Sequence, residues 1–221
     1  MGEVIAVLVG TLTLAPSAEA ISLIGNYSST NDIGSTIVNN TAGQKAVGFT
    51  LPTGSNYQLD SIVLRLQNYN TVTGGDVALI QLYADAAKTS TSPLGTTLQS
   101  VLFTNPTSTS DTVNNFTFTP TSTFTFAADT RYWLLVDATA GNFAWRANNP
   151  AITPTGIGGV AFNSYQASNN NGSSYINSTV FNSFDINATV APVPFEFAPT
   201  GGFAMLGAGW LLRKYLKNKK P

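Results

Sequence analysis

The amino-acid sequence predicts an all-β protein, namely a two-sheet antiparallel β-sandwich of jelly-roll-like form followed by a single C-terminal transmembrane helix. Short alternations of apolar and polar residues recur through the middle of the chain, separated by clusters of Gly, Pro and Asn. No stretch there keeps a helical period. Charged residues make up only 10% of the chain, and both of its ends carry uncharged apolar runs, which are typical of export and membrane signals.

Residues 1–20 predict a removable signal peptide. Residues 4–14 are almost all apolar, and behind them Ala18 and Ala20 have the small-x-small spacing that signal peptidase cuts. The first three residues include no Lys or Arg, whereas signal peptides begin with a basic segment. We therefore expect the leader to be truncated at its start, with the basic segment upstream. The alternative is a short buried helix or strand.

Residues 21–190 form the predicted sandwich domain, with nine or ten strands. In the first clear strand, Ile62, Leu64 and Leu66 alternate with residues of the opposite face, which points them into a core. Residues 76–85 follow a Thr-Gly-Gly turn signal and are partly apolar on both faces, as a central strand would be.

Aromatic residues predict the later strands. Phe116 and Phe118 alternate with Thr, and so do Phe124 and Phe126, a pattern that fits strands and fits helices poorly. Residues 132–136 are almost continuously apolar, as in a strand buried on both faces. The series ends with apolar residues at Phe184, Ile186 and Ala188. We favour a sandwich over a closed barrel, which the same spacing would also fit.

The segment 197–212 carries no charge and predicts a transmembrane helix, which we place within residues 200–221. Sixteen helical residues span about 24 Å against a hydrocarbon core of about 30 Å, so the segment is short. Arg213 and Lys214 can extend it by snorkelling. Together with Lys217 they form a basic membrane stop, which predicts a cytoplasmic C-terminus and an external sandwich. The alternative is an amphipathic helix packed on the domain.

A proline-rich linker, residues 191–199, precedes this helix and reads Ala-Pro-Val-Pro-Phe-Glu-Phe-Ala-Pro. Its order of proline motif, apolar helix and basic end resembles the C-terminal sorting signal PEP-CTERM, in a cyanobacterial-looking variant that reads Pro-Phe-Glu. The residues that carry the resemblance are Pro194, Phe195, Glu196 and Pro199. The resemblance implies that the tail holds the protein in the membrane until an exosortase-type protease cuts near the motif.

Short motifs follow one another through the body of the chain. In order they are Gly25-Asn26, Ala46-Val47-Gly48-Phe49-Thr50, Tyr57-x-Leu59, Leu82-Tyr83-Ala84-Asp85, Leu94-Gly95-Thr96, the run from Phe124 to Trp133, Phe143-x-Trp145-Arg146, and the run from Phe184 to Ala188. This succession resembles the bacterial choice-of-anchor R domain over roughly residues 23–190, in a family whose members carry different surface anchors, including PEP-CTERM tails. The resemblance implies an extracellular β-rich domain of undefined molecular function, and it brings no catalytic residues.

The charges and residue types of the body argue against several functions. The body holds eight Asp and five Lys or Arg with no basic stripe, which argues against nucleic-acid binding. The chain has no Cys and no His, so thiolate nucleophiles, Cys metal sites and the commonest general base are absent. All three Glu lie outside the body. We therefore expect no enzymatic activity, no catalytic metal and no organic cofactor.

An extracellular glycoside hydrolase remains one alternative, because that chemistry needs only a pair of carboxylates. Asp129 and Asp137 flank one predicted strand, which separates them by about 26 Å and is too far for such a pair. Asp60 and Asp76 could form such a pair only if the tertiary fold brought their carboxylates together. The plainer interpretation is that these residues cap turns.

A structural Ca²⁺ ion is a weaker candidate ligand. The segment that would hold it offers side-chain oxygens at Asn26, Ser28, Asn31 and Asp32. Ca²⁺ prefers six to eight oxygens with several carboxylates among them, and this segment lacks that acidic density.

Aromatic residues near a polar loop are candidate ligand contacts. The stretch 168–174 is rich in Asn and Ser and predicts an exposed loop or hairpin tip. Tyr165 and Tyr175 flank it, and we expect both rings to be exposed, where they could stack on sugar faces. Trp133 and Trp145 are expected to pack in the core.

These observations predict a non-enzymatic protein of the cell envelope or extracellular matrix, exported and then tethered in the membrane or sorted through its tail. One alternative is a carbohydrate-binding module for exopolysaccharide, which an exposed coplanar pair of aromatic rings would favour and burial of all three Trp would oppose. A third is a hydrolase with two Asp carboxylates about 5–10 Å apart in a cleft. The expected partners are the membrane, an exosortase-type protease and a polysaccharide.

Overall fold

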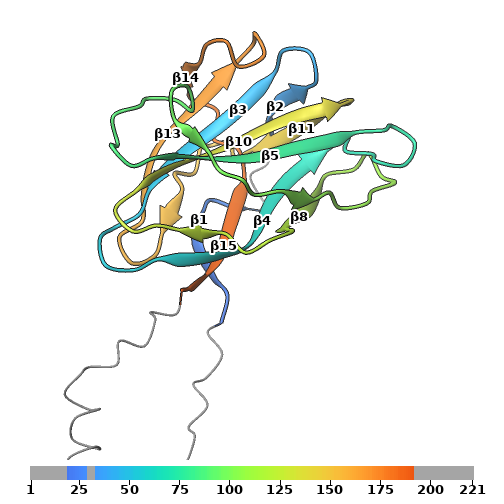
Figure 1. Cartoon of the computed structure of the whole chain (residues 1–221). Coiled ribbons are helices and arrows are strands. Elements are labelled where there is room, and N and C mark those ends of the chain that lie inside the picture. The colour runs from blue at the N-terminus through green and yellow to red at the C-terminus, as the bar shows by residue number, and fades with distance from the viewer. Residues whose placement is uncertain (1–18, 29–32, 192–221) are drawn as a thin grey trace, which may run out of the picture. The chain divides into compact units, whose positions relative to one another are not determined.

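The structure is a computed structural model, and it describes residues 19–28 and 33–191 of the 221-residue chain (Figure 1). Fifteen strands and no helix occur within these ranges, and the strands form two antiparallel sheets. The predicted all-β fold with two antiparallel sheets is therefore confirmed. The described part of the chain contains no helix that could span a membrane. The predicted C-terminal helix and most of the predicted leader lie outside the described residues.

The larger sheet has nine strands, and its main path runs in the order β12-β1-β15-β4-β11-β2. The bounds on this path are Thr155–Gly156 (β12), Ile21–Gly25 (β1), Phe184–Val190 (β15), Tyr57–Gln67 (β4), Asn142–Ala147 (β11) and Gly34–Asn39 (β2). The other members are β7 (Phe103–Thr104), which pairs with β8 (Asn114–Pro120), and β9 (Thr125–Phe126); both β8 and β9 pair with β4.

The smaller sheet has six strands in the order β14-β13-β3-β10-β5-β6. Their bounds are Ile176–Ser178 (β14), Ala161–Ser168 (β13), Gln44–Thr50 (β3), Arg131–Ala140 (β10), Val77–Asp85 (β5) and Thr97–Leu98 (β6). Ten of the fifteen strands have five or more residues, which matches the predicted nine or ten. The other five have two or three residues, too few to show an alternation in the sequence.

The main core contains apolar residues of both sheets, as expected of a β-sandwich. Ile62, Leu64 and Leu66 of β4 are fully buried in it, as the alternation predicts. The later predicted positions are also buried, at Phe116, Phe118, Phe126, Phe184, Ile186 and Ala188. Phe124 is partly buried and packs edge-on against Phe126.

β10 is buried on both faces, and it pairs with β3 along one edge and with β5 along the other. Tyr132, Leu134 and Val136 point into the main core, whereas Trp133 and Leu135 point to the opposite, outer face of the sheet. Residues 132–136 are therefore apolar throughout because both faces of the strand are buried, as predicted. β5 differs from its prediction as a central strand, because beyond β10 it pairs only with the two-residue β6.

The two ends of the sandwich lie side by side (Figure 1). β1 begins at Ile21, and Ile21 pairs with Ala188 near the end of β15. β15 lies between β1 and β4, so the last long strand of the described chain occupies the interior of the larger sheet. The β13–β14 hairpin, with its tip at residues 169–175, lies at the opposite end of the molecule (Figure 1).

Candidate functional site

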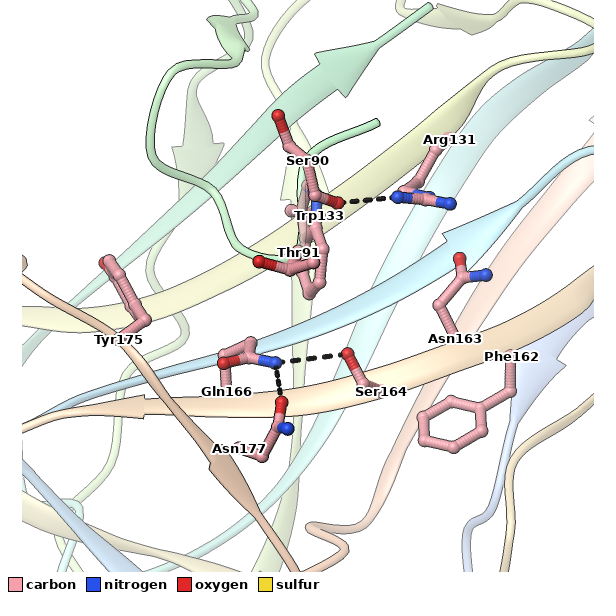
Figure 2. Close-up of a pocket in the computed structure, with 10 residues that line it drawn as sticks. All are labelled: Ser90, Thr91, Arg131, Trp133, Phe162, Asn163, Ser164, Gln166, Tyr175 and Asn177. Carbon is pink, nitrogen blue, oxygen red and sulfur yellow. Dashed lines mark hydrogen bonds between the residues drawn. The ribbon is translucent and has the colours of Figure 1, made fainter. Parts of the chain in front are cut away.

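The outer face of the six-stranded sheet carries a recess of 560 Å³, which we call the outer groove (Figure 2). Its volume lies within the range of about 300–1,000 Å³ that is usual for ligand sites. Its side chains come from β10, β13, β14, the β13–β14 loop and the loop between β5 and β6. They are Ser90, Thr91, Arg131, Trp133, Phe162, Asn163, Ser164, Gln166, Tyr175 and Asn177.

Trp133 lies in the groove because of its position on β10. Its neighbours Tyr132 and Leu134 face the main core, so the period of two places Trp133 on the outer face. It pairs with Gly48 of β3, and a Cβ atom at Gly48 would lie only 2.7 Å from the Cζ3 atom of the indole. The missing side chain thus makes room for the ring, which packs beside Ala46 in a second, smaller apolar cluster.

A loop between β5 and β6 forms one wall of the groove. Asp85 at the end of β5 accepts a hydrogen bond from the backbone N–H of Ser90 at 2.9 Å. Arg131 donates to the Ser90 carbonyl at 2.5 Å (Figure 2) and lies 3.6 Å from an Asp85 carboxylate oxygen. Lys88 forms an ion pair with Asp129 at 2.5 Å. These contacts hold Ser90 and its neighbours against the outer face, where they line the same recess as Trp133.

The opposite wall consists of β13, β14 and the loop between them. Gln166 and Asn177 are direct partners across these strands, and the Gln166 amide donates to the Asn177 carbonyl oxygen at 2.5 Å (Figure 2). It also lies 3.3 Å from the Ser164 hydroxyl. Tyr175, in the loop before β14, donates its hydroxyl to Gln44 at 2.8 Å. The wall therefore presents a row of amides and hydroxyls beside an aromatic ring.

A second hollow of 210 Å³ lies on the same outer face, and Tyr175 lines both recesses. Its other walls include Gln44, Tyr83 and Leu94. Burial raises the pKa of Tyr175 to about 12, with further contributions from the nearby Tyr83 and Asp137. The phenol is therefore protonated, and can donate a hydrogen bond, throughout the physiological pH range.

Two buried hydrogen-bond donors in the groove have no acceptor among the described residues: the indole Nε1 of Trp133 and the Nε of Arg131. Both groups can only donate, and a buried donor without an acceptor is costly. Trp133 is only 1% exposed.

Tyr165 lies in the core, so the prediction that its ring is exposed is wrong. Its side chain is 1% exposed, and its hydroxyl donates to the carbonyl of Asn182 at 2.6 Å. The cause is a β-bulge in β13, where the register with β3 shifts between Phe162 and Ser164. One extra residue reverses the face of every later residue, which turns Tyr165 inward and Gln166 outward.

The two described Trp residues are both buried, in different places. Trp145 belongs to the main core, as predicted, and its indole donates to the Ser183 carbonyl at 2.8 Å. Trp133 belongs to the outer-face cluster instead. Neither ring is openly exposed for stacking, and Trp210 lies outside the described residues. Tyr175 is half-buried and lines the groove.

In the segment that was a candidate Ca²⁺ site, Asn26 bonds to other parts of the protein. The Asn26 amide donates to the Ile152 carbonyl at 3.0 Å, and its oxygen accepts the N–H of Phe184 at 3.2 Å. Asn26 therefore joins loops to β15, while Asn31 and Asp32 lie outside the described residues and Ser28 is partly exposed. No group of three acidic residues that could hold a metal ion occurs within 19–28 and 33–191.

The Asp side chains mostly serve turns and loops. Asp76 accepts the backbone N–H groups of Asn70 and Asn142 at 2.8 and 3.0 Å. Asp137 accepts the Gln44 amide at 2.8 Å, and burial raises its pKa. The Asp76 contacts agree with the interpretation of Asp as a turn-capping residue, whereas Asp137 lies within β10 and bonds to a side chain of β3 instead.

Several predicted residues fall where the structure gives no description. They are the leader residue Ala18, the sorting-motif residues Pro194, Phe195, Glu196 and Pro199, and the membrane-stop residues Arg213, Lys214 and Lys217. Ala20 is described and is exposed, one residue before β1. Comparisons of the chain with protein-family models, with curated proteins and with solved structures found no match.

Proposed function

We propose that this chain is a non-enzymatic protein of the cell envelope or extracellular matrix, exported and then tethered or sorted through a C-terminal membrane helix. In this proposal the sandwich is jelly-roll-like and is displayed outside the cell. One observation carries it: the sandwich begins at Ile21 and ends at Val190, and these two ends lie next to each other. A leader can then be cut off, and a tail can enter a membrane, without loss of a strand.

The junction with the tail is well suited to bear an anchor. β15 is paired on both sides, with β1 and with β4, and its residues Ile186 and Ala188 are fully buried. The backbone N–H of Ala191 still bonds to the Asn56 carbonyl at 2.9 Å. Force applied through the tail would therefore load two ladders of hydrogen bonds in shear, rather than peel an edge strand.

Cell fractionation tests the tether. Residues 21–221 and residues 21–191 would each be expressed behind a bacterial host's own export signal, and membranes would be separated from soluble protein. We expect the longer form in the membrane pellet and the shorter form in the soluble fraction, because only the longer form carries the apolar tail. Equal pelleting of the two forms would contradict the proposed anchor.

The chain has no cysteine, so single introduced cysteines can report its orientation. Ser173→Cys lies at the exposed tip of the β13–β14 hairpin, and Asn218→Cys lies in the basic end. In spheroplasts, a maleimide that cannot cross membranes should label Ser173→Cys at once and Asn218→Cys only after permeabilisation. The reverse pattern would overturn the proposed topology.

A further inference from the structure

We propose that the outer groove binds a segment of a neutral polysaccharide, recognised by the side chains of Trp133, Gln166, Tyr175 and Asn177 together with Arg131 (Figure 2). This goes beyond the proposed tether, because it assigns a ligand class to a face of the sandwich that carries neither of its ends. β1 and β15 belong to the other sheet. A ligand could therefore reach the groove while both ends are occupied.

The groove offers side chains and little free backbone. Its floor is formed by β10 and β13. β10 is paired with β3 and β5, and β13 is paired with β3 and, at residues 165–167, with β14, so most of their backbone groups are already bonded to neighbouring strands. Extended peptides are usually captured by a free strand edge. A ligand here must instead bind amides, hydroxyls and the half-buried ring of Tyr175, which is a combination that suits the hydroxyl groups and apolar faces of sugars.

Two donors next to the groove that are unsatisfied within the described part of the chain favour a ligand that is rich in oxygen acceptors over an apolar one. Trp133 Nε1 and Arg131 Nε are both buried beside the groove, and neither has an acceptor among the described residues. Sugar hydroxyl and ring oxygens are acceptors of the required kind. Gln166 Nε2 is already bonded to Asn177 and Ser164, so Gln166 would offer its Oε1 atom as an acceptor and Asn177 its Nδ2 atom as a donor to hydroxyl groups of the ligand.

The charge of the groove favours a neutral ligand. Arg131 is the one charged residue among those that line it, and its guanidinium is already bonded to Ser90 and lies beside the buried Asp85. Little positive charge is left to compensate an anion. A carboxylated or sulfated polymer would also meet the negative charge of the body as a whole.

The two recesses indicate a chain of sugars rather than a single one. Tyr175 lines both the 560 Å³ groove and the 210 Å³ hollow. A polymer that passes Tyr175 could occupy both, with Leu94 and Tyr83 beside its second part. A monosaccharide would use only one of them.

Affinity electrophoresis of the full chain in mild detergent tests the proposal. The gels would contain dextran, hydroxyethylcellulose or galactomannan as neutral probes, alginate as an acidic probe, and unfolded casein peptides as a protein probe. We expect at least one neutral polymer to retard the protein, and neither alginate nor casein to do so. Retardation by no neutral polymer, or by alginate or casein alone, would overturn the proposal.

Three variants, one of them a control, test whether the polymer binds in the groove. Ser164→Phe fills the floor and should weaken retardation tenfold or more, whereas Ser35→Phe makes the same change at an exposed position of β2 and should leave it unchanged. Asn177→Ala, at an exposed position, should weaken it at least threefold and covers the case in which Ser164→Phe fails to fold. The proposal would be overturned if folded Ser164→Phe or Asn177→Ala bound the polymer as well as the parent does. It would also be overturned if Ser35→Phe lost as much binding as Ser164→Phe. Either outcome would show that the polymer binds elsewhere.

Discussion

Lys45 is a buried cation on the inner face of β3. Its side chain is 1% exposed, its ammonium group donates to the Ser178 hydroxyl, and it lies 5.4 Å from the centre of the Tyr165 ring. None of the described carboxylates pairs with it. Burial lowers the pKa of Lys45 to about 8, because the charged form loses its hydration.

This pKa makes stability depend on pH in the alkaline range. An unfolded chain has an ordinary Lys pKa near 10.4, so between about pH 8 and pH 10 the unfolded state binds more protons than the folded state. The free energy of unfolding should therefore rise as the pH increases through this window. Below pH 8 both states are charged, and the folded state bears the full cost of burying the ammonium.

Lys45→Met should remove that cost. We expect the variant to be about 1–3 kcal/mol more stable than the parent at pH 7, since the lost Ser178 bond offsets part of the gain. Urea unfolding at pH 7.0 and at pH 9.5 measures both effects, and the variant should show little change between them. An equal alkaline rise in both proteins would assign the effect to another group.

Gly48 is required by the ring that lies over it. Gly48→Ala would place a methyl group 2.7 Å from Trp133 Cζ3, so the indole would have to move. We expect a loss of about 1–3 kcal/mol in the free energy of unfolding, and a shifted indole fluorescence spectrum. Gly34→Ala is a matched control, because its methyl group would lie 3.4 Å from its nearest neighbour; a comparable loss there would refute the steric explanation.

At the scale of elements, the sequence predicted strands well wherever a regular alternation lasted for several residues. The even positions of β4 and the apolar run of β10 are buried as expected. The alternation fails at the β13 bulge, because Ala-Phe-Asn-Ser-Tyr gives no sign that one residue is extra. Tyr165 was predicted to be exposed because it flanks the polar loop 168–174, and that single insertion turns it inward.

The polar residues of the outer groove could not be predicted, for a related reason. Ser164, Gln166 and Asn177 look like any solvent-facing residues of a strand, and only the pairing of β13 with β14 brings them together. Trp133 was correctly predicted to be buried. Its burial on the outer face depends on its partner Gly48, which leaves room for the ring and lies far away in the sequence.

A short segment before β15 connects the two sheets. The fully buried Asn182 donates to the Trp145 carbonyl at 2.6 Å and accepts a bond from Thr36 at 3.2 Å, both in the larger sheet. Its own carbonyl accepts the hydroxyl of Tyr165 from the smaller sheet at 2.6 Å. One residue therefore bonds to strands of both layers.

Asn182→Ala should leave buried polar groups without partners. We expect a loss of about 1–3 kcal/mol in the free energy of unfolding, measured in urea. Asn187→Ala is the matched control, because its amide is partly exposed and makes one long bond of 3.3 Å to Ser61. It should change stability by less than about 0.5 kcal/mol. Equal losses in the two variants would contradict a special role for Asn182.

For the whole molecule, the number of layers could be predicted from the sequence, and the order of the strands could not. Alternation says which face of a strand is apolar, but pairing partners depend on contacts far apart in the chain. The position of β15 between β1 and β4 is such a case, since it joins residues near the two ends of the described chain.

Truncation tests the consequence of this order. A chain that ends after Ala191 should melt within about 2 °C of the full chain, less than the shift that about 1 kcal/mol produces in a domain of this size. A chain that ends after Ser183 lacks β15 and the buried residues Phe184, Ile186 and Ala188, and it should show no cooperative transition by circular dichroism. A cooperative transition in the shorter chain would mean that β15 is dispensable.

The interior place of β15 also sets the timing of the protein's assembly. Synthesis runs from the N-terminus, so β1 and β4 both leave the ribosome long before the strand that must fill the gap between them. Until residue 190 has emerged, the larger sheet is split, with unpaired edges and uncovered apolar faces that invite association with other chains. We therefore expect a nascent chain of this design to remain incompletely folded until its final segment appears.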